Sequence, residues 1–118
     1  MPMLTLAHER RPGVTVITVC GELDATNRAQ LDDYVKDLTD APLVFDLSRV
    51  PFMDSSGLHV LLMCDVRCRR EGGAVHLAAV QPLPARLFEI TGVLSHVPMH
   101  ATVEEAVTAA LGRADRSV

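Results

Sequence analysis

The sequence predicts a mixed α/β fold in which helices cover a mainly parallel β-sheet, with the element order β-β-α-β-α-β-α-β-α. Short β-branched or apolar runs alternate with longer segments of helical periodicity, and such alternation indicates parallel strands joined by right-handed crossovers. Glycine and proline recur between these segments, where the chain must turn. Because 118 residues suffice for a single core, we expect one domain over residues 1–118, with its core at about 4–111.

The first two strands should form the one antiparallel pair. Met3–Glu9 alternates loosely between apolar and polar residues, and Val14–Cys20 is rich in β-branched residues, which suit a pleated sheet. Pro12 and Gly13 between them predict a turn. Asp24–Thr39 then has apolar residues at helical spacing, which predicts the first helix.

The middle of the chain should supply a buried strand and the longest helix. Leu43–Leu47 is almost continuously apolar, as in a strand that is covered on both faces. Ser55–Arg70 has the apolar spacing of a helix, and the two glycines after Glu71 end it. Ala74–Ala79 predicts the next strand.

The last third of the chain should hold two helices and a weak final strand. Leu83–Thr91 predicts a short helix that ends at a glycine, Val93–Met99 a strand, and Thr102–Arg113 the last helix. The Thr102 hydroxyl suits the N-cap of that helix, because Glu105 follows at the spacing of a capping box.

Composition and charge exclude several classes of function. A formal net charge of −4 and a 3% share of aromatic residues argue against binding to a nucleic-acid backbone or stacking on its bases. The longest apolar stretches fall far short of the roughly 20 residues of a membrane span, and no signal peptide is visible. The three cysteines lack a disulfide pattern, so we expect a cytoplasmic protein. Ten arginines against one lysine suggest a GC-rich, bacterial genome.

One loop is unusual on physical grounds. Phe52 and Met53 are large and apolar, and Asp54, two serines and Gly57 follow at once, before an apolar helix. The serines therefore stand at a helix N-terminus, where backbone amides are unpaired and the field is positive. A glycine in the first turn costs about 1 kcal/mol relative to alanine, and its bare backbone would let another surface approach closely.

The run Asp54–Leu58 (Asp-Ser-Ser-Gly-Leu), preceded by Val44–Leu47, resembles the signature of STAS domains, the bacterial anti-sigma factor antagonists. Gly21–Asp24 and Arg86–Gly92 match two further segments of that family, and the resemblance covers roughly residues 4–111. It implies that the chain binds an anti-sigma factor, which then releases its sigma factor. It also implies that this anti-sigma factor is a serine kinase, which phosphorylates Ser55 and then dissociates, and that a serine phosphatase restores the unmodified form.

We expect the partner to bind the loop after the second strand, the serine loop and the outward face of the second helix. The residues predicted to take part are Glu22, Asp24, Asp54, Ser56, Gly57, His59 and Met63. A phosphate on Ser55 adds about 1.5 to 2 negative charges beside carboxylates. An uncompensated charge in an interface costs about 3–5 kcal/mol, which is enough for a switch.

Helical spacing divides the second helix into two stripes. Leu61, Cys64 and Cys68 should face the core. The other stripe, with His59, Met63, Arg67 and Arg70, should face solvent or the partner, and the edge with Asp65 and Arg69 fits neither stripe.

Several alternatives stay open. Either Ser55 or Asp54 could cap the second helix, and Asp24 could cap the first helix, contact the partner, or do both. A Ser–His hydrolase would need a glycine where Met53 stands, and the histidines lack metal-ligand spacing, so we expect no catalytic residues, metal or cofactor. No phosphate-binding glycine loop supports nucleotide binding. A role in a larger stress-signalling assembly, or as a ligand-sensing STAS module, is the alternative function.

Overall fold

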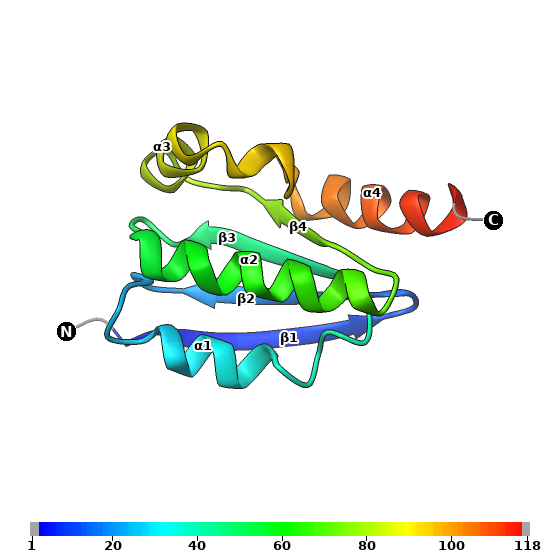
Figure 1. Ribbon diagram of the computed structural model, residues 1–118, viewed down its shortest axis with the longest axis horizontal. Helices are drawn as coiled ribbons and strands as arrows, with labels where there is room; N and C mark the ends of the chain where they lie inside the picture. Colours follow the sequence, from blue (N-terminus) through cyan, green and yellow to red (C-terminus); the bar gives the residue numbers. More distant parts are fainter. Residues whose placement is uncertain (1–2, 117–118) are drawn as a thin grey trace.

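A five-stranded sheet forms the centre of the computed structural model, which describes residues 3–116. The elements are β1 (Thr5–Arg11), β2 (Val14–Cys20), α1 (Arg28–Val35), β3 (Leu43–Arg49), α2 (Ser55–Arg70), β4 (Val75–Ala78), α3 (Pro82–Thr91), the 3-10 turn η1 (Val93–Ser95), β5 (Met99–His100) and α4 (Val103–Arg116). The strands lie in sequence order, with β1 antiparallel to β2 and the rest parallel (Figure 1). The predicted fold class and element order are confirmed; residues 1–2 and 117–118 of the predicted domain lie outside the described residues.

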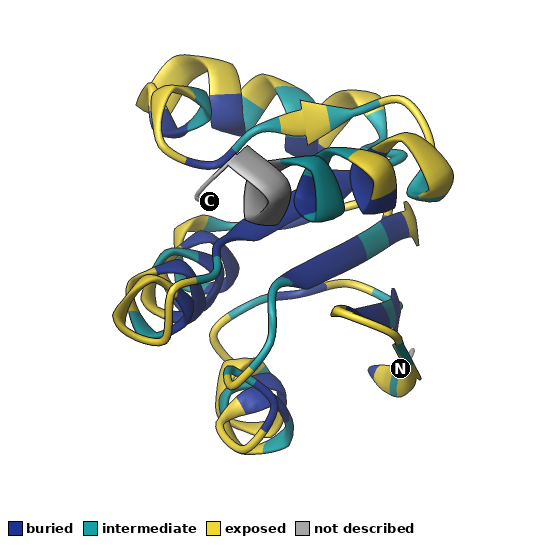
Figure 2. Ribbon diagram, turned by 90° about the vertical axis from the view of Figure 1, so that its right-hand side faces the viewer, coloured by how far each residue is buried: buried dark blue, intermediate teal, exposed yellow. Residues whose placement is uncertain are grey.

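The helices cover the two faces of the sheet unequally. The larger core takes Leu31 from α1, Leu61 from α2 and Phe88 from α3. α4 covers the opposite face (Figure 2), where Ala106 and Ala110 join a smaller core. β3 lies between the two layers and gives Phe45 to the first core and Val44 to the second. This double burial explains why the strand is almost continuously apolar, as predicted.

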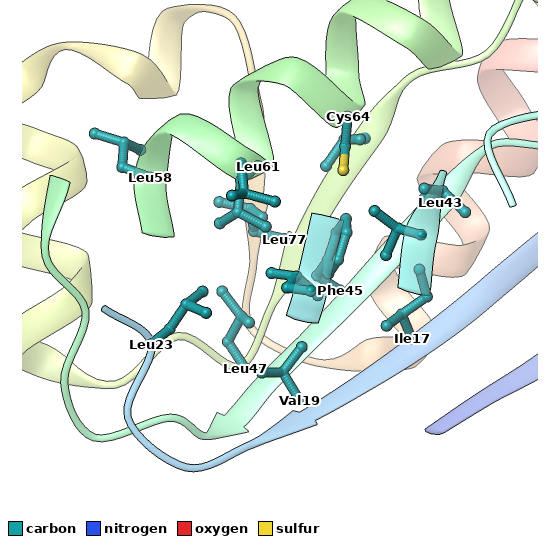
Figure 3. Close-up of a cluster of buried hydrophobic side chains, with 14 of the residues drawn as sticks. Ile17, Val19, Leu23, Leu43, Phe45, Leu47, Leu58, Leu61, Cys64 and Leu77 are labelled. Carbon is teal, nitrogen blue, oxygen red and sulfur yellow. The ribbon is translucent and has the colours of Figure 1, made fainter. Parts of the chain in front are cut away.

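α2 packs along the sheet with its apolar stripe facing inward. Leu61 and Cys64 point toward Phe45 of β3 (Figure 3), and both are buried in the same core as Leu58 and Leu47. Burying one large aliphatic or aromatic side chain contributes about 1.5–3 kcal/mol, so this face of α2 holds the helix firmly in place.

The first helix is shorter than the predicted Asp24–Thr39. The side chain and backbone N–H of Thr26 both donate to the Asp24 carboxylate, and Asn27 Oδ1 accepts from the Asp24 N–H at 3.0 Å. Short polar side chains that bind the nearby backbone compete with helix formation, so these residues form turns and α1 begins only at Arg28. Asp24 therefore caps the turn and not the helix.

The predicted strand Val93–Met99 is wrong except at its end. Gly92, with φ of 75°, turns the chain, and the Val97 N–H donates to the Val93 carbonyl at 3.0 Å. The two valines are thus one helical turn apart, and both are buried. The remaining strand, β5, pairs only two residues with β4.

The first strand lies two residues later than the predicted Met3–Glu9. It runs up to the turn, where Arg11 pairs with Val14 and Gly13 takes a positive φ of 81°. The other predicted boundaries agree within two residues, except that α4 continues to Arg116.

Candidate functional site

The loops that follow β2 and β3 lie side by side and are joined through their backbones. The Leu23 N–H donates to the Phe52 carbonyl at 3.1 Å, and the Asp54 N–H donates to the Leu23 carbonyl at 3.2 Å. Leu23 also forms a parallel bridge with Met53, and both of these side chains are buried. The two loops therefore form one unit that fixes where α2 begins.

Gly57 serves the packing of this unit. A Cβ atom on Gly57 would lie 2.7 Å from Cγ of Leu23 and 2.8 Å from Cγ of Met53, distances that real Cβ contacts do not show. Gly57 is itself buried. The close approach that this glycine permits is thus made within the chain, in place of the predicted approach to a partner.

Asp54, and not Ser55, caps α2. The Asp54 carboxylate accepts from the backbone N–H groups of Ser56 at 2.9 Å and Gly57 at 3.3 Å. The Asp54 carbonyl accepts from the Leu58 N–H at 3.2 Å. Ser55 is the first residue of the helix and is exposed. Within residues 3–116 its hydroxyl has no hydrogen-bond partner, so it is available to another molecule.

The carboxylates predicted for the partner surface are held differently. Glu22 is exposed, whereas Asp24 and Asp54 are half-buried. The hydrogen bonds from the Thr26 side chain and backbone lower the pKa of the Asp24 carboxyl below its ordinary value. Asp24 and Asp54 thus order their own loops, and Glu22 is the most accessible of the three.

Three of the four residues in the stripe predicted for the outward face of α2 are exposed, and Arg67 is the exception. His59 and Arg70 are exposed, and Met63 keeps 36% of its surface accessible. Arg67 is half-buried and donates to the Asp32 carboxylate of α1 at 3.2 Å. Ser56, between the two faces, is half-buried as well.

A groove of about 340 Å³ runs between α1 and α2. The spacing along α2 could not point to Arg28, Ala29 and Asp32, because these three lining residues lie on α1. The predicted topology could have identified them, since the helices of consecutive right-handed crossovers pack side by side on one face of the sheet. The groove is lined by Arg28, Ala29, Asp32, His59, Val60, Met63 and Arg67.

The edge of α2 that helical spacing left unplaced is structural: Asp65 is buried, and Arg69 is exposed but bound to it. Asp65 is 4% exposed, and its carboxylate accepts from the Val75 N–H at 3.0 Å and from Arg69 Nε at 2.7 Å. Arg69 Nη2 also donates to the His96 carbonyl at 2.9 Å. This network ties α2 to β4 and to the segment after η1.

The arrangement offers an exposed hydroxyl rather than an activated nucleophile. Burial raises the pKa of the Cys64 and Cys68 thiols to about 12, so both stay protonated near neutral pH. In the described part of the chain, no three His, Cys, Asp or Glu side chains gather where a metal ion could bind. Nor does any described helix have the length and apolar character needed to cross a membrane.

Comparison with known proteins points to one family. The family model of the STAS domain matches residues 5–106. Anti-sigma-F factor antagonist RsfA of Mycobacterium tuberculosis is 32% identical, over 89% of this chain and 84% of RsfA. The crystal structure of an anti-sigma factor antagonist from Mycobacterium paratuberculosis superposes with a TM-score of 0.84 at 30% identity, covering 92% of this chain and 94% of that one.

A third relative is known in a modified state. The Bacillus cell fate determinant SpoIIAA in its phosphorylated form superposes with a TM-score of 0.70 at 25% identity, over 89% of this chain and 98% of SpoIIAA. The first two relatives are named for antagonism of an anti-sigma factor and not for a catalysed reaction. The sheet order, the serine loop and these matches agree with the resemblance found in the sequence. The chain belongs to the STAS domain family.

Proposed function

We propose that this chain is an anti-sigma factor antagonist, which binds an anti-sigma factor and thereby frees a sigma factor. The name of RsfA, which aligns with 89% of this chain, supports the proposal. The observation that carries it is the state of Ser55. Its hydroxyl is exposed at the first residue of α2 and takes no part in capping that helix, because Asp54 does so.

The partner surface that we propose has an acidic part and a helical part. The acidic part consists of the joined loops, with Glu22, Asp24 and Asp54. The helical part is the outward face of α2, where exposed His59 and partly exposed Met63 follow Ser55 and Ser56. An apolar side chain within a polar, accessible rim is typical of a protein interface.

Phosphorylation of Ser55, carried out by the anti-sigma factor as a serine kinase, ends the complex. The phosphate adds about 1.5 to 2 negative charges next to the Asp54 carboxylate. A partner that covers this charge must desolvate it, and an uncompensated interface charge costs about 3–5 kcal/mol, or roughly a hundredfold to a few thousandfold in affinity. A serine phosphatase then restores the unmodified chain, and we place this cycle in the cytoplasm. The phosphorylated structure of the relative SpoIIAA supports this step.

Labelling with the anti-sigma factor and ATP tests the assignment. The wild-type chain and the control variant Ser56→Ala should each gain one phosphate in the mass spectrum, and Ser55→Ala should gain none. Ser55→Ala should also stay bound to the anti-sigma factor after ATP is added, since it cannot acquire the charge. Equal labelling of Ser55→Ala and the wild type would refute Ser55 as the acceptor.

A further inference from the structure

A phosphate on Ser55 finds three of the backbone amides at the start of α2 already in use. The N–H groups of Ser56 and Gly57 donate to the Asp54 carboxylate, and that of Leu58 donates to the Asp54 carbonyl. These are the donors that an anion at a helix N-terminus would otherwise use. The Asp54 carboxylate also repels a second anion. Of the amides in this first turn, only the Ser55 N–H has no acceptor among the described residues. The phosphate therefore needs further donors from side chains.

His59 is the nearest candidate on the same helix. Residues four apart in a helix lie on one face, with Cβ atoms about 5–6 Å apart, so His59 stands directly beside Ser55. Both residues are exposed. Within the described residues, the His59 ring makes no hydrogen bond or ion pair, so it is available to a new partner.

A second donor comes from the neighbouring helix. Arg28 at the start of α1 lines the same groove as His59, and its guanidinium has no ion pair among residues 3–116. The other charged groups that face His59 in the groove are Arg67 and Asp32, which pair with each other at 3.2 Å. The groove thus offers one guanidinium and one imidazole that no carboxylate neutralises.

We propose that Arg28 and His59 bind the phosphate of phosphorylated Ser55 at the end of the α1–α2 groove nearest the serine. This inference rests on the proposed phosphorylation of Ser55. Phosphorylation then changes two surfaces at once: it adds charge at the start of α2, and it occupies the Arg28 guanidinium and the His59 imidazole of the groove. A partner that contacts both the acidic loops and the groove therefore loses favourable interactions at both surfaces.

The test uses chains in which phosphoserine is incorporated at position 55 during translation, so that no kinase is needed. The titration of the phosphate between pH 4 and 9 is followed by ³¹P NMR. Nearby cations favour the dianion, so the second pKa of the phosphate should be higher in Arg28→Gln and His59→Gln than in the wild type, by about half a unit or more. Arg86→Gln, which removes an exposed arginine on α3, is the matched control and should not change it.

The result separates this inference from the function on which it rests. Titration midpoints in Arg28→Gln and His59→Gln that equal that of Arg86→Gln would overturn the inference, even if the kinase labels Ser55. Labelling of another residue would overturn the proposed function and leave the ³¹P result untouched. Unchanged melting temperatures of the unmodified variants show that the fold is intact, and the effect should shrink in 1 M salt, where charges are screened within about 3 Å.

Discussion

The inward and outward faces of α2 belong to one helix but carry different physical roles. The inward face holds the core residues Leu58, Leu61 and Cys64, all nearly inaccessible to water. The outward face holds Ser55 and His59, which contact solvent. A charge added to the outward face therefore need not disturb the packing beneath it. The comparison teaches that the residues that stabilise the fold and the proposed phosphorylation site occupy opposite faces of one helix.

Leu61→Ala should have the largest effect, because it removes a buried side chain from the inward face. Leu61 is 2% exposed, and such truncations cost about 2–5 kcal/mol of unfolding free energy. Urea denaturation measures this loss. Leu83→Ala is the control, since Leu83 is 65% exposed on α3 and should change stability by less than about 0.5 kcal/mol. Similar losses in both variants would contradict the division into faces.

Asp65→Ala breaks the buried polar edge of the inward face. It leaves the Val75 N–H without its acceptor and releases Arg69, and an unsatisfied buried donor costs about 1–3 kcal/mol. Asp65→Asn keeps one carbonyl oxygen for the Val75 N–H and should lose less. Thermal unfolding measures the loss of stability in the two variants. Equal losses would mean that the hydrogen bond to β4 contributes nothing to stability.

Asp54→Ala tests the N-cap of α2, from which both faces of the helix begin. The variant removes the cap from the N–H groups of Ser56 and Gly57, which should cost about 1 kcal/mol. Asp54→Ser retains a capping oxygen without the charge and should recover most of the stability in a urea titration. Thr102→Ala is the matched cap variant on α4, where Thr102 accepts from the Glu105 N–H at 3.1 Å as predicted. If Asp54→Ala kept the wild-type unfolding free energy while Thr102→Ala lowered it, the capping role of Asp54 would be contradicted.

Met63→Ala should have the smallest effect on stability and a clear effect on binding. Met63 lies in the groove and is 36% exposed, so its loss should cost less than about 0.5 kcal/mol of stability. Calorimetric titration with the anti-sigma factor should show about fivefold or greater weakening, as expected for an apolar contact in an interface. Val66→Ala is the control, because Val66 is 40% exposed on the same helix but does not line the groove. Equal binding by both variants would remove Met63 from the partner surface.

The sequence pattern predicted correctly those helices and strands whose buried faces can be recognised from the spacing of their own apolar residues. The apolar run from Leu43 to Leu47 fits a strand between two layers, and the start of α2 follows from Asp54 and the apolar spacing after it. By contrast, Val93 and Val97 occur in a short apolar stretch that suits a strand equally well, and only the turn after Gly92 places them in a helical arrangement.

The candidate site was predictable where neighbours on one helix, or loops at the same edge of the sheet, form it. Ser55, His59 and Met63 share one helix, so their spacing predicted a common face. The role of Gly57 could not be predicted, because it depends on Leu23 in a different loop. Arg28 escaped notice for the same reason: it joins the groove through the packing of α1 on α2.

The side of the sheet on which the strand connections run limits the kind of binding site that can form at the carboxyl edge of the sheet. Open α/β sheets bind small molecules in a crevice between neighbouring strands whose connections leave to opposite faces. Here the connections from β2 to β3, β3 to β4 and β4 to β5 carry α1, α2 and α3, which all pack into the same core. The winding therefore never reverses within residues 3–116, and no such crevice opens there. Without a crevice of that kind, the exposed Ser55 and the joined loops lie at the surface of this edge, where another macromolecule can contact them.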